Sequence, residues 1–267
     1  MTWSTTSDIG VFLAAARAFL ESRPVEHTVL LTEAAYLHAR PSAATDQLHG
    51  WWRTAGGDVA GAFVRAPRHP PVLSMVPADG MADLADVLAG ARGIGVDGRL
   101  ADSVAVAWER RTGVRLTERS RITLYRLERL EPPAPPRGSA RTAGPADRDL
   151  LVSWFERMMA AFPDDPSDLA YVVDDPISVG GITLWEVDGV PVAMAGRSRT
   201  VAGMVRLSAV YAPDDETHAD AAFVAACATA AETARDVLVF GSADDGVADG
   251  KYRALGFRPV LDRVTLG

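Results

Sequence analysis

The sequence is poor in the residues that form disulfides and metal sites. Cys227 is the only cysteine among 267 residues, so no disulfide can close within the chain. It lies among alanines with no histidine or arginine at helical spacing, which predicts a small core residue rather than a nucleophile. A zinc site needs several cysteine or histidine ligands at short spacing, so we expect no metal. The histidines lack such spacing; they are His27, His38, His49, His69 and His218.

Long apolar runs and an excess of basic charge are also lacking. The longest largely apolar stretch, residues 221–231, is about half of the roughly 20 residues that a membrane-spanning helix needs. Residues 1–8 hold no basic side chain, so we expect no signal peptide and a cytoplasmic protein without a membrane partner. The chain has 27 Lys and Arg against 35 Asp and Glu, a net charge of −8. No basic cluster is present, which argues against nucleic acid as a partner.

Proline is concentrated in one segment. Residues 131–138 (EPPAPPRG) hold four prolines within five positions, a pattern that favours an extended, semi-rigid conformation. We expect a linker over residues 131–139, between a domain of residues 1–130 and a domain of residues 140–267. The alternative is an extended crossover segment inside a single domain.

The half after the prolines alternates helical and strand patterns. Apolar residues recur at helical spacing from Leu150 to Phe162, and Asp188-Gly189 between two apolar runs is typical of a hairpin turn. Helices are predicted over residues 145–162, 167–173 and 217–235, with a short one that ends at 255. Strands are predicted over residues 182–187, 190–197, 204–211, 237–240 and 260–266. This order predicts an α/β fold with a mixed sheet.

The first half repeats part of this order. Its pattern predicts strand, glycine turn and strand over residues 50–64, a strand over 71–76, a helix over 82–91, a strand over 94–96, a helix over 100–111 and a strand over 121–127. The segment Ala107–Val114 parallels Gly250–Phe257, each with a glycine after a helix. We interpret the halves as related domains in tandem, the first diverged. The alternative is chance recurrence of common units.

Two segments of the second half resemble the GNAT (GCN5-related N-acetyltransferase) family. They are Leu207–Pro213 (LSAVYAP), at a strand end, and Lys251–Val260 (KYRALGFRPV), near the end of the sequence. The resemblance covers about residues 140–267, whereas residues 1–130 share only the order of elements. It implies tandem GNAT-like domains with mixed sheets, acetyl-CoA as cofactor, and transfer of an acyl group to an amine.

The resemblance also implies where the cofactor would bind. Backbone amides at the strand end would polarise the acyl carbonyl, and the start of the following helix would hold the pyrophosphate. A residue of the loop before the late helix would contact the cofactor as well. The implied cofactor-binding residues are Val210, Tyr211, Ala212, Thr217, His218, Ala219 and Asp249.

Two residues are candidates for the catalytic steps. Tyr252 matches the family's tyrosine that protonates the departing thiolate, and packing is an equally good explanation of it. Glu186, on a predicted strand, is a candidate general base, and a solvated strand face is the alternative.

The predicted phosphate loop departs from the family pattern. The family has a glycine-rich loop here, whereas residues 214–220 (DDETHAD) hold no glycine and four carboxylates. Carboxylates that face a pyrophosphate would repel it, by about 1 kcal/mol for each pair of unit charges about 4 Å apart in water. The alternative is that these residues only cap the helix.

We expect an acyl-CoA-dependent N-acetyltransferase that acts on an amine of a small molecule by direct transfer. The alternative is a GNAT-fold protein that has lost acetyl-CoA binding and acts as a ligand-binding protein or as a different enzyme on a metabolite. A third interpretation is a structural or regulatory subunit that pairs through its sheet, so a homodimer is an open alternative.

Overall fold

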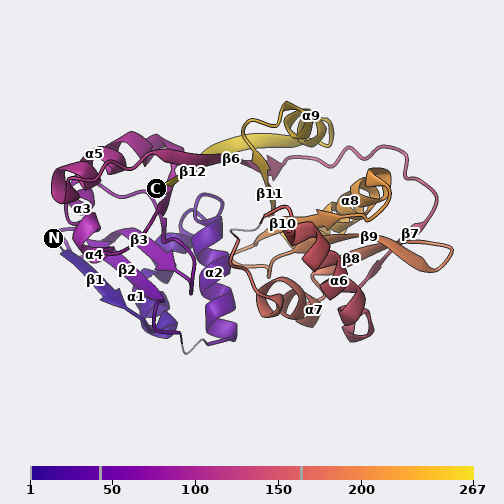
Figure 1. Cartoon of the computed structure of the whole chain (residues 1–267), viewed down its shortest axis with the longest axis horizontal. Helices are drawn as coiled ribbons and strands as arrows, with labels where there is room; N and C mark the ends of the chain where they lie inside the picture. Colours follow the sequence, from indigo (N-terminus) through magenta and orange to yellow (C-terminus); the bar gives the residue numbers. More distant parts are fainter. Residues whose placement is uncertain (1, 42–43, 163–164) are drawn as a thin grey trace. The chain divides into compact units, whose positions relative to one another are not determined.

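The computed structural model describes residues 2–41, 44–162 and 165–267 (Figure 1). The chain forms two compact units, each built from strands and helices. Unit 1 consists of residues 1–124, 241–246 and 259–267, and unit 2 consists of residues 125–240 and 247–258. Parallel and antiparallel strand pairs combined with helices confirm the predicted α/β fold class.

The units differ from the predicted domain limits of 1–130, 131–139 and 140–267. The change of unit falls after Leu124, inside a strand, and residues 131–139 belong to unit 2 rather than to a linker. Residues 259–267 belong to unit 1, where Arg263–Leu266 pair antiparallel with Ile94–Asp97. A strand that pairs with a distant part of the chain leaves no local signal, so periodicity alone does not reveal this exchange.

The sheet of unit 1 is mixed. Its strands, in sheet order, are β1 (Thr2–Thr6), β2 (Leu48–Arg53), β3 (Val59–Arg65), β4 (Val72–Leu73), β5 (Ile94–Asp97), β12 (Phe257–Leu266) and β6 (Glu118–Leu127). The pairs from β1 to β12 are antiparallel, except that β4 and β5 are parallel. Strands β6 and β12 each continue into unit 2.

Helices cover both faces of the sheet in unit 1. They are α1 (Ile9–Glu21), α2 (Thr28–Ala39), α3 (Ala78–Ala82), α4 (Leu84–Val87) and α5 (Ala101–Thr112). Leu48 packs into the cluster of α4 and α5, whereas the ring of His49 lies 5.6 Å from that of Phe12 in α1. Because neighbouring strand residues point to opposite faces, α1 lies on the face opposite to α4 and α5.

Unit 2 has the same kind of architecture. Its strands, in sheet order, are β6, β11 (Asp236–Ser242), β10 (Met204–Tyr211), β9 (Val190–Arg197), β8 (Ile182–Val187) and β7 (Ser139–Thr142). The β10–β11 pair is parallel, and the pairs from β10 to β7 are antiparallel. The predicted hairpin turn is confirmed, since Asp188 and Gly189 have φ values of 52° and 79°.

Helices also cover both faces of the sheet in unit 2. They are α6 (Arg148–Met159), α7 (Asp175–Ser178), α8 (Glu216–Thr233) and α9 (Gly246–Ala254). Trp185 belongs to a cluster of buried residues around α8 that includes Phe223, the α8 cluster. Its neighbour Leu184 belongs to a cluster around α6 that includes Trp154, the α6 cluster. Because neighbouring strand residues point to opposite faces, α8 and α6 lie on opposite faces of the sheet. The sequence of α8 is apolar on nearly all sides, and its Ala222, Ala226 and Cys227 are fully buried. Cys227 is therefore a core residue, as predicted.

Some helices and strands differ from those that the sequence patterns predict. The predicted helix 82–91 is two short helices, α3 and α4, because Asp83 between them has non-helical backbone angles (φ −99°, ψ 0°). The predicted helix 167–173 is a π-helical turn at Ala170–Asp174 followed by α7. Strands β1 and β7 and helices α1 and α2 were not predicted.

Candidate functional site

Strand β10 is irregular where it ends. Ser208 pairs with Gly196 of β9 and Tyr211 pairs with Met194, so one residue more lies on β10 than on β9. Ala209 within this bulge has a φ of 51°, in the left-handed region that residues other than glycine rarely adopt. A β-bulge of this kind re-aims backbone and side chains and is common beside functional sites.

The bulge lies where β10 also leaves β11. The parallel ladder joins Met204–Leu207 to Asp236–Val239. Beyond it, Val210 packs against the α8 cluster, and the ring of Tyr211 lies 6.3 Å from that of Trp154 in α6. The stretch from Ala209 to Val210 is thus outside both regular ladders. Such a backbone can present its amide groups to a ligand carbonyl.

Helix α8 starts directly after this strand end, and its own sequence caps it. The carboxylate of Asp215 accepts hydrogen bonds from the amide nitrogen of Thr217 (2.9 Å) and from its Oγ1 (2.8 Å). These bonds hold the pKa of Asp215 below its usual value. The amide of His218 donates to the carbonyl oxygen of Asp215 at 3.1 Å. Asp215 therefore uses amides at the helix start that would otherwise be available to an anion.

One of the other acidic residues has a basic partner. Lys251 on α9, the only lysine of the chain, forms an ion pair with Asp220 on α8. Asp214 and Glu216 are exposed. The negative charge at the start of α8 is therefore smaller than the sequence alone suggests.

Tyr252 of α9 lies in an aromatic cluster. Its ring centroid is 5.2 Å from Tyr125, 5.9 Å from Phe223 of α8 and 5.9 Å from Phe257. Val210 packs against the same cluster of buried residues. Tyr252 is only partly buried, so packing and proton transfer are compatible roles for this side chain.

Asp249, a predicted cofactor contact, is held by two neighbours. The hydroxyl of Tyr125 donates to its Oδ1 at 2.7 Å, and Nε of Arg253 lies 2.8 Å from its Oδ2. The hydrogen bond from Arg253, followed by that from Tyr125, lowers the pKa of this carboxyl. The carboxylate therefore fixes α9 to strand β6.

Glu186, the candidate base, is part of a different network. Its Oε1 accepts a hydrogen bond from Nε of Arg141 at 2.7 Å, and the same guanidinium binds Asp147 at 2.7 Å. The bonds to Asp147 and Glu186 raise the pKa of Arg141. Glu186 lies on β8, two strands away from β10 in the sheet, in an ion-pair network that connects β7 and β8 to the start of α6. These contacts agree with a structural role.

Unit 2 thus brings some of the predicted site residues together. Val210, Ala212 and Tyr252 pack against one cluster, and α8 starts nearby in the chain with Thr217, His218 and the buried Ala219. Tyr211 faces the α6 side. A cap by the acidic residues was one of the two interpretations of this loop, whereas the pairing of Lys251 with Asp220 was not predicted. An Asp before a helix is a recognisable capping signal, whereas an ion pair between two helices has no sequence signal.

The equivalent place in unit 1 holds an arginine. Past the paired residues Val72 and Gly95, the terminal nitrogen of Arg263 lies 3.1 Å from the carbonyl oxygen of Leu73 on β4 and 3.3 Å from that of Gly95 on β5. Burial lowers the pKa of Arg263 to about 10, with Asp97 opposing the shift. This side chain therefore connects β4 and β5 through their carbonyl oxygens.

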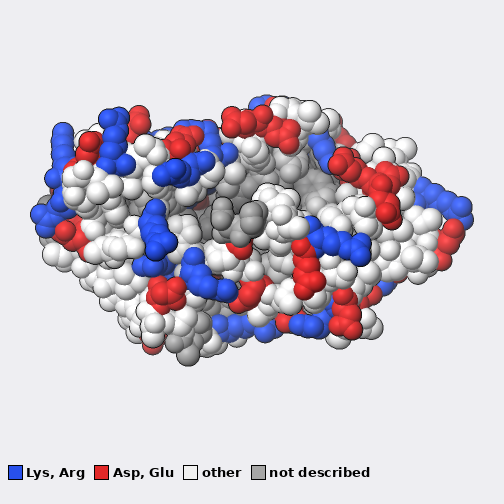
Figure 2. All heavy atoms as spheres, viewed as in Figure 1, with Lys and Arg blue, Asp and Glu red and all other residues white. Residues whose placement is uncertain are grey.

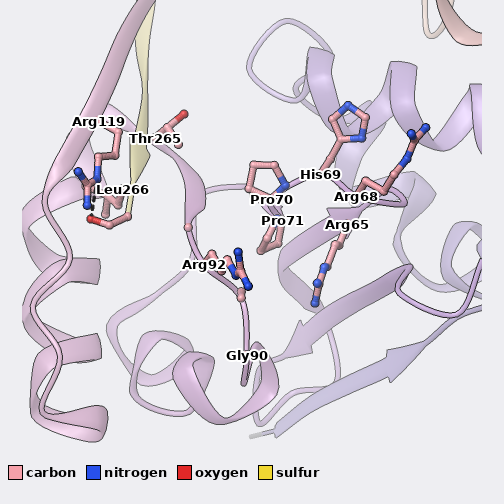
Figure 3. A pocket seen from close by; sticks show the side chains of 13 residues that line it. Arg65, Arg68, His69, Pro70, Pro71, Gly90, Arg92, Arg119, Thr265 and Leu266 are labelled. Atoms are coloured by element: carbon pink, nitrogen blue, oxygen red, sulfur yellow. Dashed lines mark hydrogen bonds between the residues drawn. The ribbon is translucent and has the colours of Figure 1, made fainter. Parts of the chain in front are cut away.

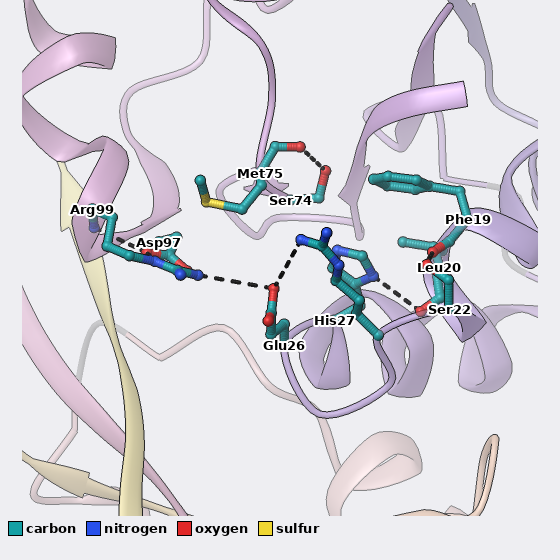
Figure 4. A network of polar contacts seen from close by, with 10 residues as sticks. Phe19, Leu20, Ser22, Glu26, His27, Ser74, Met75, Asp97 and Arg99 are labelled. Atoms are coloured by element: carbon teal, nitrogen blue, oxygen red, sulfur yellow. Dashed lines mark hydrogen bonds and ion pairs between the residues drawn. The ribbon is translucent and has the colours of Figure 1, made fainter. Parts of the chain in front are cut away.

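A second polar network in unit 1 connects β5 with the α1–α2 loop (Figure 4). The guanidinium of Arg99 binds Asp97 through two hydrogen bonds of 2.9 and 2.7 Å and lies 3.8 Å from Glu26. Burial alone would raise the pKa of Asp97, but the hydrogen bonds from Arg99 outweigh it and lower the pKa. The ring Nδ1 of His27 donates to the carbonyl oxygen of Leu20 at 2.9 Å. The side chains of Arg99, Asp97 and His27 are therefore engaged in contacts that hold β5 and the α1–α2 loop in place.

The surface carries charges of both signs. On the face that Figure 2 shows, Lys and Arg side chains are interspersed with Asp and Glu. Across residues 2–41, 44–162 and 165–267, no group of three or more His, Cys, Asp and Glu side chains is arranged to hold a metal ion. No helix in the part of the chain that the structure describes has both the length and the hydropathy to span a bilayer.

The sequence matches no protein-family model and no curated protein. Solved structures do match it. A GCN5-related N-acetyltransferase from Sphaerobacter thermophilus is 14% identical with a TM-score of 0.62, covering 99% of this chain and 94% of that one. A GNAT-family acetyltransferase from Colwellia psychrerythraea is 10% identical with a TM-score of 0.61, covering 100% and 98%.

A third similar structure is that of a tandem protein. It is a tandem GNAT protein from the clavulanic acid biosynthesis pathway, without acetyl-CoA, and it is 15% identical with a TM-score of 0.58. The match covers 99% of this chain and 98% of that one. The chain therefore has the fold of the GNAT acetyltransferases over its whole length, including that of a tandem GNAT protein, as the sequence resemblance predicted.

Proposed function

We propose that unit 2 transfers an acyl group from an acyl-CoA thioester to an amine of a small molecule. The observation that carries the proposal is the bulge at Ala209–Val210, which takes backbone amides out of strand pairing directly before the start of α8. The GNAT fold of the chain supports acyl transfer in general. Acetyl-CoA is proposed as the donor because the resemblance implies it.

The chemistry that these residues would perform is a direct transfer. The amine nitrogen attacks the acyl carbon, the C–N bond forms and the C–S bond breaks. Backbone amides near Val210 stabilise the negative charge on the carbonyl oxygen. The Tyr252 hydroxyl gives its proton to the departing thiolate, and the proton released from the amine passes to solvent water, from which the tyrosine is reprotonated.

The test of this role removes one hydroxyl. Tyr252→Phe keeps the aromatic packing with Tyr125 and Phe223, so the fold should be retained. We expect kcat for acetyl transfer to a panel of small amines to fall by about 10²-fold or more, with little change in KM for acetyl-CoA. The matched control is Tyr36→Phe on α2 of unit 1. Equal rates for wild type and Tyr252→Phe would remove Tyr252 from the mechanism.

A second function is favoured by one specific observation. Asp215 caps α8 through the amide of Thr217, so a carboxylate lies where a pyrophosphate would be expected. A GNAT-fold protein with a carboxylate at the start of this helix would bind a different ligand, such as a cationic metabolite. Acetyl-CoA binding by the wild-type chain distinguishes the two proposals, because only the first requires it.

A further inference from the structure

Unit 1 contains a pocket at the end of its sheet that the proposed transfer does not use. Its volume is about 400 Å³, and Figure 3 shows the side chains that line it. Arg65 is the last residue of β3, Pro70 and Pro71 precede β4, and Arg92 precedes β5. The pocket therefore opens where the parallel strands β4 and β5 begin, and Arg263 bonds to these strands further along.

The lining of this pocket is cationic. None of its 13 lining residues is Asp or Glu, and four are arginines. Two of these arginines have acceptors close by: Nε of Arg119 donates to the carbonyl oxygen of Gly267 at 3.1 Å, and the backbone amide of Arg68 donates to Asp46 at 2.7 Å. Figure 3 shows the side chain of Arg68 directed away from those of Arg65 and Arg92.

Arg65 and Arg92 lack such compensation. Among the residues that the structure describes, no carboxylate forms an ion pair with either guanidinium. The Nε–H of Arg65 is buried and has no hydrogen-bond acceptor within the described protein. A buried donor without an acceptor is destabilising, and more so when it is charged, so a bound anion near this guanidinium would be stabilising.

We propose that this pocket binds a small phosphate-bearing ligand through Arg65 and Arg92. Two guanidinium groups without carboxylate partners match the charge of a phosphate group, which is about −1.5 to −2 at pH 7. The planar guanidinium fork also fits phosphate oxygens in pairs. Pro70, Pro71 and Leu266 provide an apolar wall for the remainder of the ligand. The volume lies within the roughly 300–1,000 Å³ of small-molecule sites.

The first experiment titrates the full chain with inorganic phosphate by calorimetry at constant ionic strength. Acetyl-CoA is left out because it carries phosphate groups itself. We expect saturable binding that weakens about tenfold or more in Arg65→Gln and in Arg92→Gln. The matched control is Arg110→Gln, an exposed arginine of α5 outside the pocket, which should bind as wild type does. Acetate, a monoanion, should bind more weakly than phosphate.

A second experiment needs no variant and therefore does not depend on folding of Arg65→Gln. The wild-type chain is treated with an arginine-directed dicarbonyl reagent, with and without phosphate, and the modified peptides are mapped by mass spectrometry. We expect phosphate to reduce the modification of Arg92. It should also reduce that of Arg65, if the reagent reaches this side chain, and it should not change the modification of Arg110. A sugar phosphate in place of phosphate tests whether a larger ligand fits. The proposal would be overturned by no binding at about 10 mM phosphate, by equal phosphate binding of wild type and both pocket variants, or by equal labelling of Arg92 with and without phosphate.

Discussion

At the scale of single residues, the most consequential contact is the cap that Asp215 provides to α8. The acidic loop 214–220 allowed two interpretations from sequence, a cap or a charge that repels a pyrophosphate. The hydrogen bonds from Thr217 to Asp215 establish the cap. The two interpretations do not exclude each other, because a capping carboxylate also places negative charge at the helix start.

His49 is a residue whose burial makes the stability of the protein depend on pH. It is fully buried beside Phe12, and neither ring nitrogen has a hydrogen-bond partner among the described residues. Burial lowers its pKa from 6.5 to about 4, with Asp8 opposing the shift. The unfolded chain therefore binds more protons than the folded chain between these two pH values. The stability that neutral His49 contributes is complete above about pH 6.5 and is lost as the pH falls toward 4.

We expect the free energy of unfolding to fall by about 1.5 kcal/mol from His49 alone between pH 6.5 and pH 5. Urea denaturation of wild type and His49→Leu at several pH values measures this. The variant should have the smaller pH dependence, although His27, whose pKa is also lowered, leaves a dependence of the same sign in both. Identical slopes for wild type and variant would contradict the assignment.

At the scale of elements, the two glycines that follow α5 and α9 show how similar sequence patterns differ in structure. Gly113 has a φ of 73° and Gly256 a φ of 93°, so both have the left-handed conformation that ends a helix. A Cβ on Gly113 would meet no atom within 4 Å, whereas a Cβ on Gly256 would overlap the carbonyl oxygen of Arg129. Gly256 is therefore required for two reasons, its positive φ and its lack of a side chain.

Replacement of each glycine by alanine separates these effects. Gly113→Ala should cost about 1–2 kcal/mol of stability, from the left-handed backbone alone. Gly256→Ala should cost at least about 3 kcal/mol, because the steric overlap adds to the same backbone cost. Denaturant titrations of the two variants give both values. Similar losses for the two would show that the backbone near Arg129 moves away without penalty.

The elements also show which parts of the fold the sequence patterns predict. The hairpin at Asp188-Gly189, the buried helix α8 and the short strand β11 each have a strong local signal, and the structure has them close to where they were predicted. The bulge at Ala209 has no such signal, because alanine is not a residue that favours positive φ. The proline-rich segment suggested a linker from composition, yet residues 132–136 form one wall of a groove of about 620 Å³ against α8.

At the scale of the whole molecule, the exchange of the last strand determines what can fold alone. Val264 and Leu266 of β12 are buried in unit 1, where they pack with residues of β5 and α5. A chain of residues 1–130 lacks this strand and leaves the edge of β5 unpaired. Exposed apolar surface and open strand edges destabilise such a fragment.

We therefore expect the isolated fragment 1–130 to be unfolded or aggregated. Circular dichroism and limited proteolysis would show this, with the full chain as the control. A fragment 1–130 that is joined to residues 257–267 by a flexible linker should recover protease resistance in unit 1. A fragment 1–130 that is folded and monomeric by itself would contradict the role of β12.

The proposed acyl-donor site in unit 2 depends on the start of α8. Its central test is calorimetric titration of the full chain with acetyl-CoA, with CoA as the second ligand. We predict binding with a Kd on the order of 10 µM. Asp215→Asn, which retains a capping side chain but removes its charge, should bind more tightly than wild type. No binding of acetyl-CoA by either protein at about 1 mM ligand would contradict the acyl-transfer function and favour a ligand-binding role for this fold.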